Sequence, residues 1–278
     1  VAGQDQPVLS LMNRAFHPSG VDWEVRVTKS DGDARRYALE AVEAGVDAVG
    51  VYGGDGTVME VASGLIGTDI PLAIFPGGTA NVISVELGIP SDLTEAMALA
   101  CSEARSIRTI DVGQVDGRYF LLRVGMGFEA QMVAGADRGL KDRIGVLAYG
   151  VSAVQALTEP SIARYQIEID GEHYETEGMT CIVANSASLG QLGLTLASKV
   201  DVSDGLLDVL VVRQADLGSL ISVAASVVTG TENADRLLHW QGREIRVTAE
   251  PPQVVQVDGE VLGEVQRRAD RPAHPPRV

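Results

Sequence analysis

The spacing of apolar residues changes near the middle of the chain. Up to about residue 110, helical and strand patterns alternate: residues 33–45 carry small apolar residues at helical spacing and end on Gly45, and residues 47–52 form a short apolar run. Strands and helices in alternation are typical of a parallel sheet with crossover helices. We therefore predict an α/β domain with a parallel sheet over residues 1–111. Its further elements are a helix with one face over Leu9, Met12 and Phe16, a strand over 21–27, a helix over 57–65 and a strand over 71–75.

Beyond residue 111, short strand patterns separated by turn signals replace this alternation. Asp170-Gly171, between two of these runs, is a strong hairpin signal. Helical patterns over residues 129–157 and 216–228 interrupt the strands. We predict a β-rich antiparallel sandwich domain over residues 112–265 and a disordered tail over 266–278. The predicted strands cover residues 118–124, 163–169, 174–176, 179–184, 206–211, 244–249 and 254–257.

The composition excludes some classes of binding partner and indicates where in the cell the protein is found. The 278 residues include 38 acidic and 22 basic side chains, which gives a net charge of −16. Broad nucleic-acid binding and wholesale adsorption to anionic lipid rely on many cationic contacts, so this charge argues against both. Cys101 and Cys181 form no CxxC motif, which favours buried, reduced cysteines. The sequence shows neither a signal-peptide pattern nor the roughly 18 apolar residues of a spanning helix, so we expect a cytoplasmic protein.

A glycine-rich loop, Gly53-Gly54-Asp55-Gly56-Thr57, follows the apolar run 47–52. Glycines let backbone N–H groups approach an anion, and the N-terminus of the next helix adds unpaired donors. A carboxylate beside a bound phosphate is repelled unless a cation lies between them, so Asp55 suggests Mg²⁺. These residues alone leave open a tight turn in which Asp55 caps the helix, and Thr57 to Glu60 fit a capping box for that helix.

A second glycine loop, Pro-Gly-Gly-Thr-Ala-Asn at 76–81, follows the predicted strand over 71–75. Loops at the same ends of neighbouring parallel strands line one crevice, where ligands of open α/β sheets bind. The spacing matches neither the P-loop pattern GxxxxGK[ST] nor the Rossmann pattern GxGxxG. We therefore expect a nucleotide site of another type.

Taken in order, the motifs of the chain resemble those of the bacterial diacylglycerol kinase-like lipid kinases, which are related to sphingosine and ceramide kinases. The resemblance covers nearly the whole chain. NAD kinases also carry GGDGT, but their later motifs are not seen here. The resemblance rests on GGDGTVMEV at 53–61, FPGGTANVISVELGIP at 75–90, IDVGQVDGRYF at 110–120, SDGLLDVLVV at 203–212 and VQVDGE at 255–260.

The resemblance implies a two-domain kinase with ATP and Mg²⁺ in the N-terminal domain and a lipid hydroxyl in the cleft against the β-rich domain. Asp55 would hold the magnesium through a water-linked network. The residues that the resemblance places at the nucleotide are Thr28, Gly53, Gly54, Gly56, Thr57, Gly78, Thr79, Asn81 and Asp111.

The resemblance also assigns carboxylates in the second domain. Asp258 matches the proposed general base of the family, with Glu260 two positions further on a strand end, where the two side chains would point the same way. Asp201, Asp204 and the carbonyl of Leu206 resemble a second, structural Mg²⁺ site of some members. The residues alone leave an ordinary Asp-Gly turn open at Asp258 and at Asp204.

Several positions depart from the family pattern. The family usually begins with an apolar strand ending in Asn-Pro and a turn, of which residues 1–3 look like the remainder, so we expect a truncated start. The family also continues beyond Glu260 with an apolar strand that residues 266–270 do not supply. Val82 replaces a frequent aspartate, and Arg123 replaces a frequent asparagine.

The expected reaction is transfer of the γ-phosphate of ATP to a lipid hydroxyl, most simply that of diacylglycerol. A sphingoid base, a glycolipid or phosphatidylglycerol as acceptor stays open, as does a kinase-like binding protein without turnover. We expect transient docking on a membrane surface, no nucleic-acid partner, and leave a homodimer open. Arg138, Lys141 and Arg143, beside the apolar run 144–157, either meet lipid headgroups or form a solvated helix face.

Overall fold

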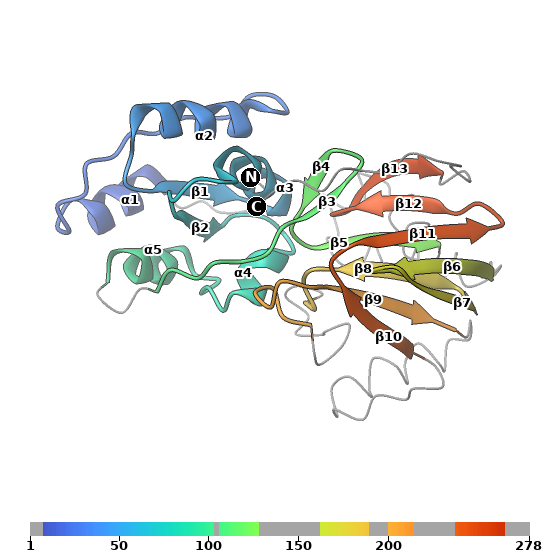
Figure 1. The fold of residues 1–278 in the computed structure, drawn as a ribbon. Helices are drawn as coiled ribbons and strands as arrows, with labels where there is room; N and C mark the ends of the chain where they lie inside the picture. The colour runs from blue at the N-terminus through green and yellow to red at the C-terminus, as the bar shows by residue number, and fades with distance from the viewer. Residues whose placement is uncertain (1–7, 103–105, 128–161, 189–199, 214–236, 265–278) are drawn as a thin grey trace. The chain divides into compact units, whose positions relative to one another are not determined.

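The computed structural model describes residues 8–102, 106–127, 162–188, 200–213 and 237–264 (Figure 1). Contacts divide the chain into two compact units, residues 1–109 and 110–278. The predicted helices over 129–157 and 216–228, the basic side chains near residue 140 and the tail lie outside the described residues.

The first unit is built around two parallel strands, β1 (Val49–Gly53) and β2 (Leu72–Pro76), which α3 (Asp55–Leu65) connects. This arrangement confirms the predicted parallel sheet. In the register, Val51 lies opposite Ile74 and Tyr52 lies opposite Phe75. Because side chains alternate along a strand, these two pairs face opposite sides of the sheet, and each side can be covered by helices.

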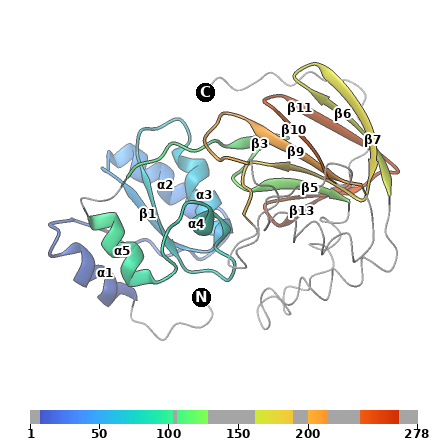
Figure 2. The same cartoon turned by 90° about the horizontal axis from the view of Figure 1, so that it is seen from below.

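Helices cover the sheet of the first unit. α1 (Val8–Phe16) and α5 (Leu93–Cys101) join one apolar cluster around Phe75, in which Met97 is fully buried (Figure 2). α2 (Asp33–Ala44) packs against α3, where a Cβ added at Gly64 would lie only 2.8 Å from the Cβ of Ala38. The short α4 (Val82–Glu86) follows β2. The glycine at position 64 therefore lets two helices approach closely.

The prediction of a strand over residues 21–27 is wrong. Within the described part of the first unit, β1 and β2 are the only paired strands, and residues 21–29 are irregular. Val27 is 69% exposed, and Val21 and Val25 are also exposed. Alternating apolar residues form a strand only where a neighbouring strand accepts the backbone hydrogen bonds, and none is paired here.

The second unit is built from antiparallel strands, which confirms the predicted β-rich domain. Its strands are β3 (Gly113–Val115), β4 (Arg118–Phe120), β5 (Arg123–Gly127), β6 (Ala163–Ile169), β7 (Glu172–Gly178), β8 (Thr180–Ala184), β9 (Leu207–Val212), β10 (Leu237–Gly242), β11 (Ile245–Glu250), β12 (Val254–Val257) and β13 (Glu260–Glu264).

Two of the sheets form a sandwich. The larger has the order β10-β9-β8-β5-β12-β13 and the smaller the order β11-β6-β7, while β3 and β4 pair separately. Tyr165 and Ile167 of β6 and Val209 and Val211 of β9 belong to one buried cluster between the two sheets. Cys181 is buried in the same cluster. The alternation of apolar residues that predicted these strands thus corresponds to their inward faces.

One predicted strand is broken in two. The run 118–124 was predicted as a single strand, but β4 ends at Phe120 and β5 begins at Arg123. Leu121 and Leu122 lie between them, and their amides donate to a side chain that is 136 or more positions away in the sequence. Apolar residues continue across this break, so the local sequence does not predict that the strand is interrupted.

Candidate active site

The loop after β1 brings several amides to one place. α3 begins at Asp55, two residues earlier than predicted, and Gly54 is its N-cap residue. The amides of the first helical turn have no acceptor within a helix, so those of Asp55, Gly56 and Thr57 are donors available to an anion. The carbonyl of Gly53 accepts a hydrogen bond of 2.9 Å from the amide of Gly77, which joins the starts of the two glycine loops.

The two glycine loops of the first unit touch each other. A Cβ added at Gly78 would lie 2.5 Å from the Cα of Gly54, closer than real Cβ atoms approach. One at Gly77 would meet the Tyr52 ring at 2.8 Å. Only residues without a side chain permit this approach. The predicted juxtaposition of the two loops is therefore present in the structure.

Asn81 holds the second loop in shape. Its side-chain oxygen accepts from the amide of Gly78 at 2.9 Å, and its side-chain nitrogen donates to the carbonyl of Gly78 at 3.0 Å. Asn81 is buried and adopts φ 47°, in the left-handed region that asparagine tolerates better than most residues. Its side chain thus supports the loop, while Thr79 lies within the turn that it closes.

Asp55 lies between the two loops. Its Oδ1 accepts a 3.1 Å hydrogen bond from the amide of Ile83, which ties the start of α3 to the first turn of α4. No described residue donates to Oδ2 in the hydrogen bonds of the structure. Mg²⁺ in nucleotide sites commonly takes one or two carboxylates together with phosphate oxygens and waters. Asp55 fits such a ligand, with Oδ2 as the available oxygen.

The predicted capping box at Thr57 to Glu60 is wrong. Thr57 lies inside the helix, and the Glu60 carboxylate accepts hydrogen bonds from the amides of Gly32 and Ala34, at 3.1 and 3.2 Å. Glu60 therefore caps α2 and not its own helix. The sequence pattern was consistent with a local cap, and only the packing of α2 on α3 provides the distant one. Thr28 is exposed and directly precedes the turn that leads into α2.

The carboxylate of Asp258, in the second unit, accepts hydrogen bonds from three backbone amides. It lies in the turn after β12 with φ 47°. Oδ1 accepts from the amides of Leu122 and Arg123 at 3.0 and 2.9 Å, and Oδ2 accepts from that of Leu121 at 2.8 Å. The amide of Asp258 itself donates to the carbonyl of Arg123. This one side chain therefore sets the corner between β4 and β5.

The environment of Asp258 suits a proton acceptor. Burial raises the pKa of its carboxyl above the ordinary 3.8, against the opposite effect of the amides of Arg123, Leu121 and Leu122 and the charge of Arg123. Oδ2 accepts one amide where Oδ1 accepts two, so Oδ2 keeps room for a further hydrogen bond. Asp258 can accept a proton at that atom while its other contacts keep the side chain in place.

Glu260 does not share a strand end with Asp258. It is exposed, begins β13 and pairs with Val257 across the hairpin. The expectation that both side chains extend from one strand end is wrong, because Asp258 occupies the left-handed turn position. The backbone turns between them, and the alternation rule for strands no longer applies.

The predicted metal ligands near residue 204 bind their own turn. Asp201 accepts from the amide and hydroxyl of Ser203, and Asp204 accepts from the amide of Leu206. Asp111 lies in this unit and accepts a 2.7 Å hydrogen bond from the amide of Gly205. Among the described residues, no three His, Cys, Asp or Glu side chains are gathered around a point that could hold a metal ion. The second Mg²⁺ site therefore stays a prediction.

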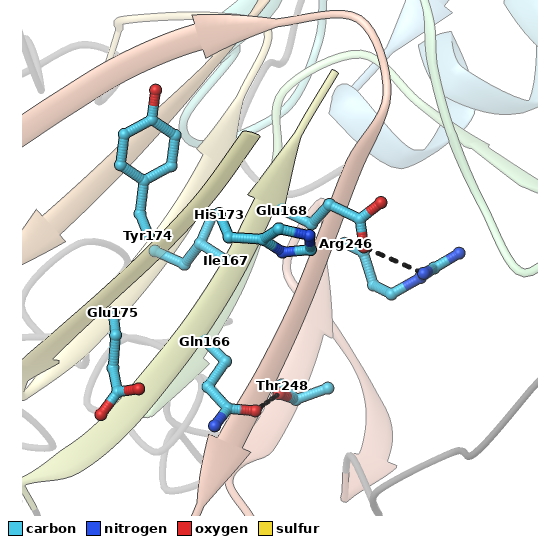
Figure 3. Close-up of a pocket in the computed structure, with 8 residues that line it drawn as sticks. All are labelled: Gln166, Ile167, Glu168, His173, Tyr174, Glu175, Arg246 and Thr248. Carbon is cyan, nitrogen blue, oxygen red and sulfur yellow. Dashed lines mark hydrogen bonds and ion pairs between the residues drawn. The ribbon is translucent and has the colours of Figure 1, made fainter. Parts of the chain in front are cut away.

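A hollow of about 400 Å³ lies elsewhere, on the outer face of the sheet β11-β6-β7 (Figure 3). Glu168, His173 and Arg246 point into it, and the guanidinium of Arg246 is 3.0 Å from Glu168. None of the predicted site residues lines this hollow. The candidate chemistry therefore belongs to the glycine loops and to Asp258.

In the portions of the chain that the structure describes, no helix is both long and apolar enough to cross a membrane.

Comparison with known proteins identifies the class. The family model of the diacylglycerol kinase catalytic domain matches residues 2–115, and that of the YegS C-terminal NAD kinase beta sandwich-like domain matches residues 123–276. The chain therefore belongs to the family of diacylglycerol kinases and YegS-like lipid kinases and is a lipid kinase enzyme.

Particular relatives show how far the likeness extends. The chain is 33% identical to a "Probable lipid kinase YegS-like" of Stenotrophomonas maltophilia, over 90% of this chain and 84% of the relative. It is 29% identical to a "Diacylglycerol kinase" of Bacillus subtilis, over 92% of this chain and 84% of the relative. A "putative diacylglycerol kinase" structure from Bacillus anthracis has 28% identity and a TM-score of 0.80, over 95% of this chain and 88% of that one. The chain spans about half the length, 49%, of the Synechocystis "Uncharacterized protein sll0036", with which it shares 38% identity.

Proposed function

We propose that this chain transfers the γ-phosphate of ATP to the hydroxyl group of a lipid, most simply diacylglycerol. The observation that carries the proposal is the contact of two glycine loops around Asp55, in a chain of the lipid kinase family. The name of the Bacillus subtilis relative supports the choice of acceptor. Cytoplasmic location and transient docking on a membrane surface belong to the same proposal.

In the proposed reaction, the amides of Asp55, Gly56 and Thr57 bind phosphate oxygens at the N-terminus of α3. Thr28 and Thr79 supply further nucleotide contacts. A Mg²⁺ ion held by Asp55 would neutralise phosphate charge. These groups orient the γ-phosphate for in-line attack, since phosphoryl transfer depends chiefly on position and charge.

The acceptor contributes its hydroxyl oxygen. This oxygen forms a bond to the γ-phosphorus, the bond to the β–γ bridging oxygen breaks, and ADP leaves. The hydroxyl proton passes to Oδ2 of Asp258, the oxygen with room for another hydrogen bond. A raised pKa improves this carboxylate as a base, because proton affinity rises with pKa.

The proposal is tested by a transfer assay with labelled ATP. Wild type and Asp55→Ala are given mixed micelles of diacylglycerol, phosphatidylglycerol, a sphingoid base or a glycolipid. We expect wild type to label diacylglycerol and Asp55→Ala to be at least about 100-fold slower, because a main stabiliser of phosphate charge is lost. Wild type that binds Mg-ATP but labels no lipid would contradict the proposal, and labelling of another lipid alone would correct the acceptor.

The pH dependence of the reaction should report Asp258. The base must be ionised to accept a proton, so kcat/KM should fall as the pH is lowered through its pKa. Because burial raises that pKa, the fall should be centred above 3.8. The measurement is kcat/KM across the acid range, with circular dichroism at each pH as the control for unfolding. An acid limb centred at or below 3.8 would show that Asp258 is not the titrating base.

A further inference from the structure

Glu60 makes an unusual connection between two helices of the first unit. α2 begins after Gly32, which has φ 84° and offers no side chain to cap the helix. The cap comes instead from the Glu60 carboxylate, which accepts from the amides of Gly32 and Ala34 through separate oxygens at 3.1 and 3.2 Å. Most helices are capped by a serine, threonine, asparagine or aspartate at the N-cap itself. A cap from another helix fixes where the two helices lie relative to each other.

Asp33, the first residue of α2, binds the segment that precedes the helix. Its Oδ2 accepts from the amides of Lys29 and Ser30, at 2.9 and 3.1 Å, and its Oδ1 accepts from Arg36 at 2.8 Å. The hydrogen bond from Arg36 and those from the two amides hold the pKa of this carboxyl well below its usual range. These hydrogen bonds favour the ionised carboxylate, which keeps the turn over residues 29–32 closed.

The other end of the connection is the first glycine loop. Glu60 lies on α3, five residues after Asp55, and a helix is a rigid element that rises about 1.5 Å per residue. Close packing reinforces it, because the hydrogen at Gly64 leaves room for Ala38 and the carbonyl of Arg35. The turn after Thr28 is thus held by Asp33 and by Glu60, and Glu60 lies on the helix that begins in the phosphate loop.

We propose that Glu60 and Asp33 are positioning residues for the nucleotide, which hold Thr28 at a set place relative to the Gly53–Thr57 loop. The inference rests on the proposed function, since it takes the loop and Thr28 as nucleotide contacts. Neither carboxylate touches the nucleotide in this role. Each acts through the backbone of the turn over residues 29–32.

The test measures nucleotide binding and turnover separately. Dissociation constants of Mg-ATP are measured by calorimetry for wild type, Glu60→Ala, Glu60→Gln and Asp33→Ala, with Glu43→Ala as the matched control. Glu43 is an exposed carboxylate of α2 with no role in the site. KM for ATP, KM for lipid and kcat follow from the transfer assay. Melting temperatures record any general loss of stability.

We expect Glu60→Ala to weaken Mg-ATP binding about tenfold, because the amides of Gly32 and Ala34 lose their acceptor and the turn before α2 is no longer fixed relative to α3. Glu60→Gln keeps one acceptor oxygen and should recover part of the loss, while KM for lipid stays constant. Glu43→Ala should match wild type. If Glu60→Ala does not fold, Glu60→Gln and Asp33→Ala decide in its place.

Two outcomes separate this inference from the proposed function. Wild-type affinity for Mg-ATP in folded Glu60 and Asp33 variants would overturn the inference and leave the kinase proposal standing. A wild type that binds Mg-ATP but labels no lipid would overturn the kinase proposal, and the inference would still be decided by the binding constants. A wild type that binds no Mg-ATP would overturn both.

Discussion

Asp258→Asn is expected to slow lipid phosphorylation by at least about 100-fold and to destabilise the second unit at the same time. The carboxylate is the proposed base, and loss of a general base typically slows a reaction about 10²- to 10⁴-fold. An asparagine keeps one oxygen for the amides of Leu122 and Arg123, but its nitrogen cannot accept from Leu121. Because this leaves a partly buried amide unpaired, the free energy of unfolding should fall by about 2 kcal/mol.

Asp170→Asn is the control that separates the loss of stability from the loss of turnover. Asp170 also lies in a turn with φ 51°, and its carboxylate accepts from the amides of Arg243 and Glu244. The control should keep its turnover per folded molecule and lose less stability than Asp258→Asn, because Asp170 is exposed and its Oδ1 alone accepts from both amides. Unfolding is followed by urea titration, and turnover is normalised to the folded fraction. Equal turnover in Asp258→Asn and Asp170→Asn would remove Asp258 from the chemistry and leave it a structural residue.

Gly78→Ala is expected to weaken nucleotide binding strongly. The added methyl would lie 2.5 Å from the Cα of Gly54, so one of the two loops must move. The nearest contact atom belongs to the backbone of Gly54, and the side-chain oxygen of Asn81, which shapes the second loop, would lie only 3.0 Å away. We expect the affinity for Mg-ATP to fall at least about tenfold, which corresponds to about 1.4 kcal/mol. Calorimetry with Mg-ATP measures the change in affinity directly.

Gly56→Ala provides the comparison within the same loops. A Cβ at Gly56 would meet no atom within 4 Å, and the backbone amide is retained. Its effect on Mg-ATP affinity should therefore be much smaller than that of Gly78→Ala. Similar affinity in both variants would show that the close approach of Gly54 and Gly78 is not required for binding.

Much of the fold follows from local patterns. The two apolar runs around Val51 and Ile74 predict the parallel strands, because strands buried on both faces are apolar throughout. Alternation over residues 163–169 predicts β6, whose inward residues lie in the core of the sandwich. In both cases burial in the fold agrees with the preference of the residues themselves.

The wrong and missing strand predictions have a common physical cause. Whether a segment forms a strand depends on a partner that is distant in the sequence. Residues 21–27 have the alternation of a strand but no paired neighbour. The apolar run 118–124 is divided because the Asp258 carboxylate takes the amides of residues 121–123. β10 and β13 were not predicted, since Trp240 and Glu260 belong to runs with little alternation and are paired only within the larger sheet.

For the site, the sequence alone indicates which residues are candidates, and the tertiary structure decides which groups each of them contacts. Glycines beside Asp55 already indicate a phosphate-binding loop, because residues without side chains let an anion come close to the backbone amides. Two findings depend on contacts between residues 26 to 137 positions apart: Glu60 caps the other helix, and three amides hold Asp258. A carboxylate binds whichever donors the fold brings within about 3 Å, and sequence spacing carries no record of them.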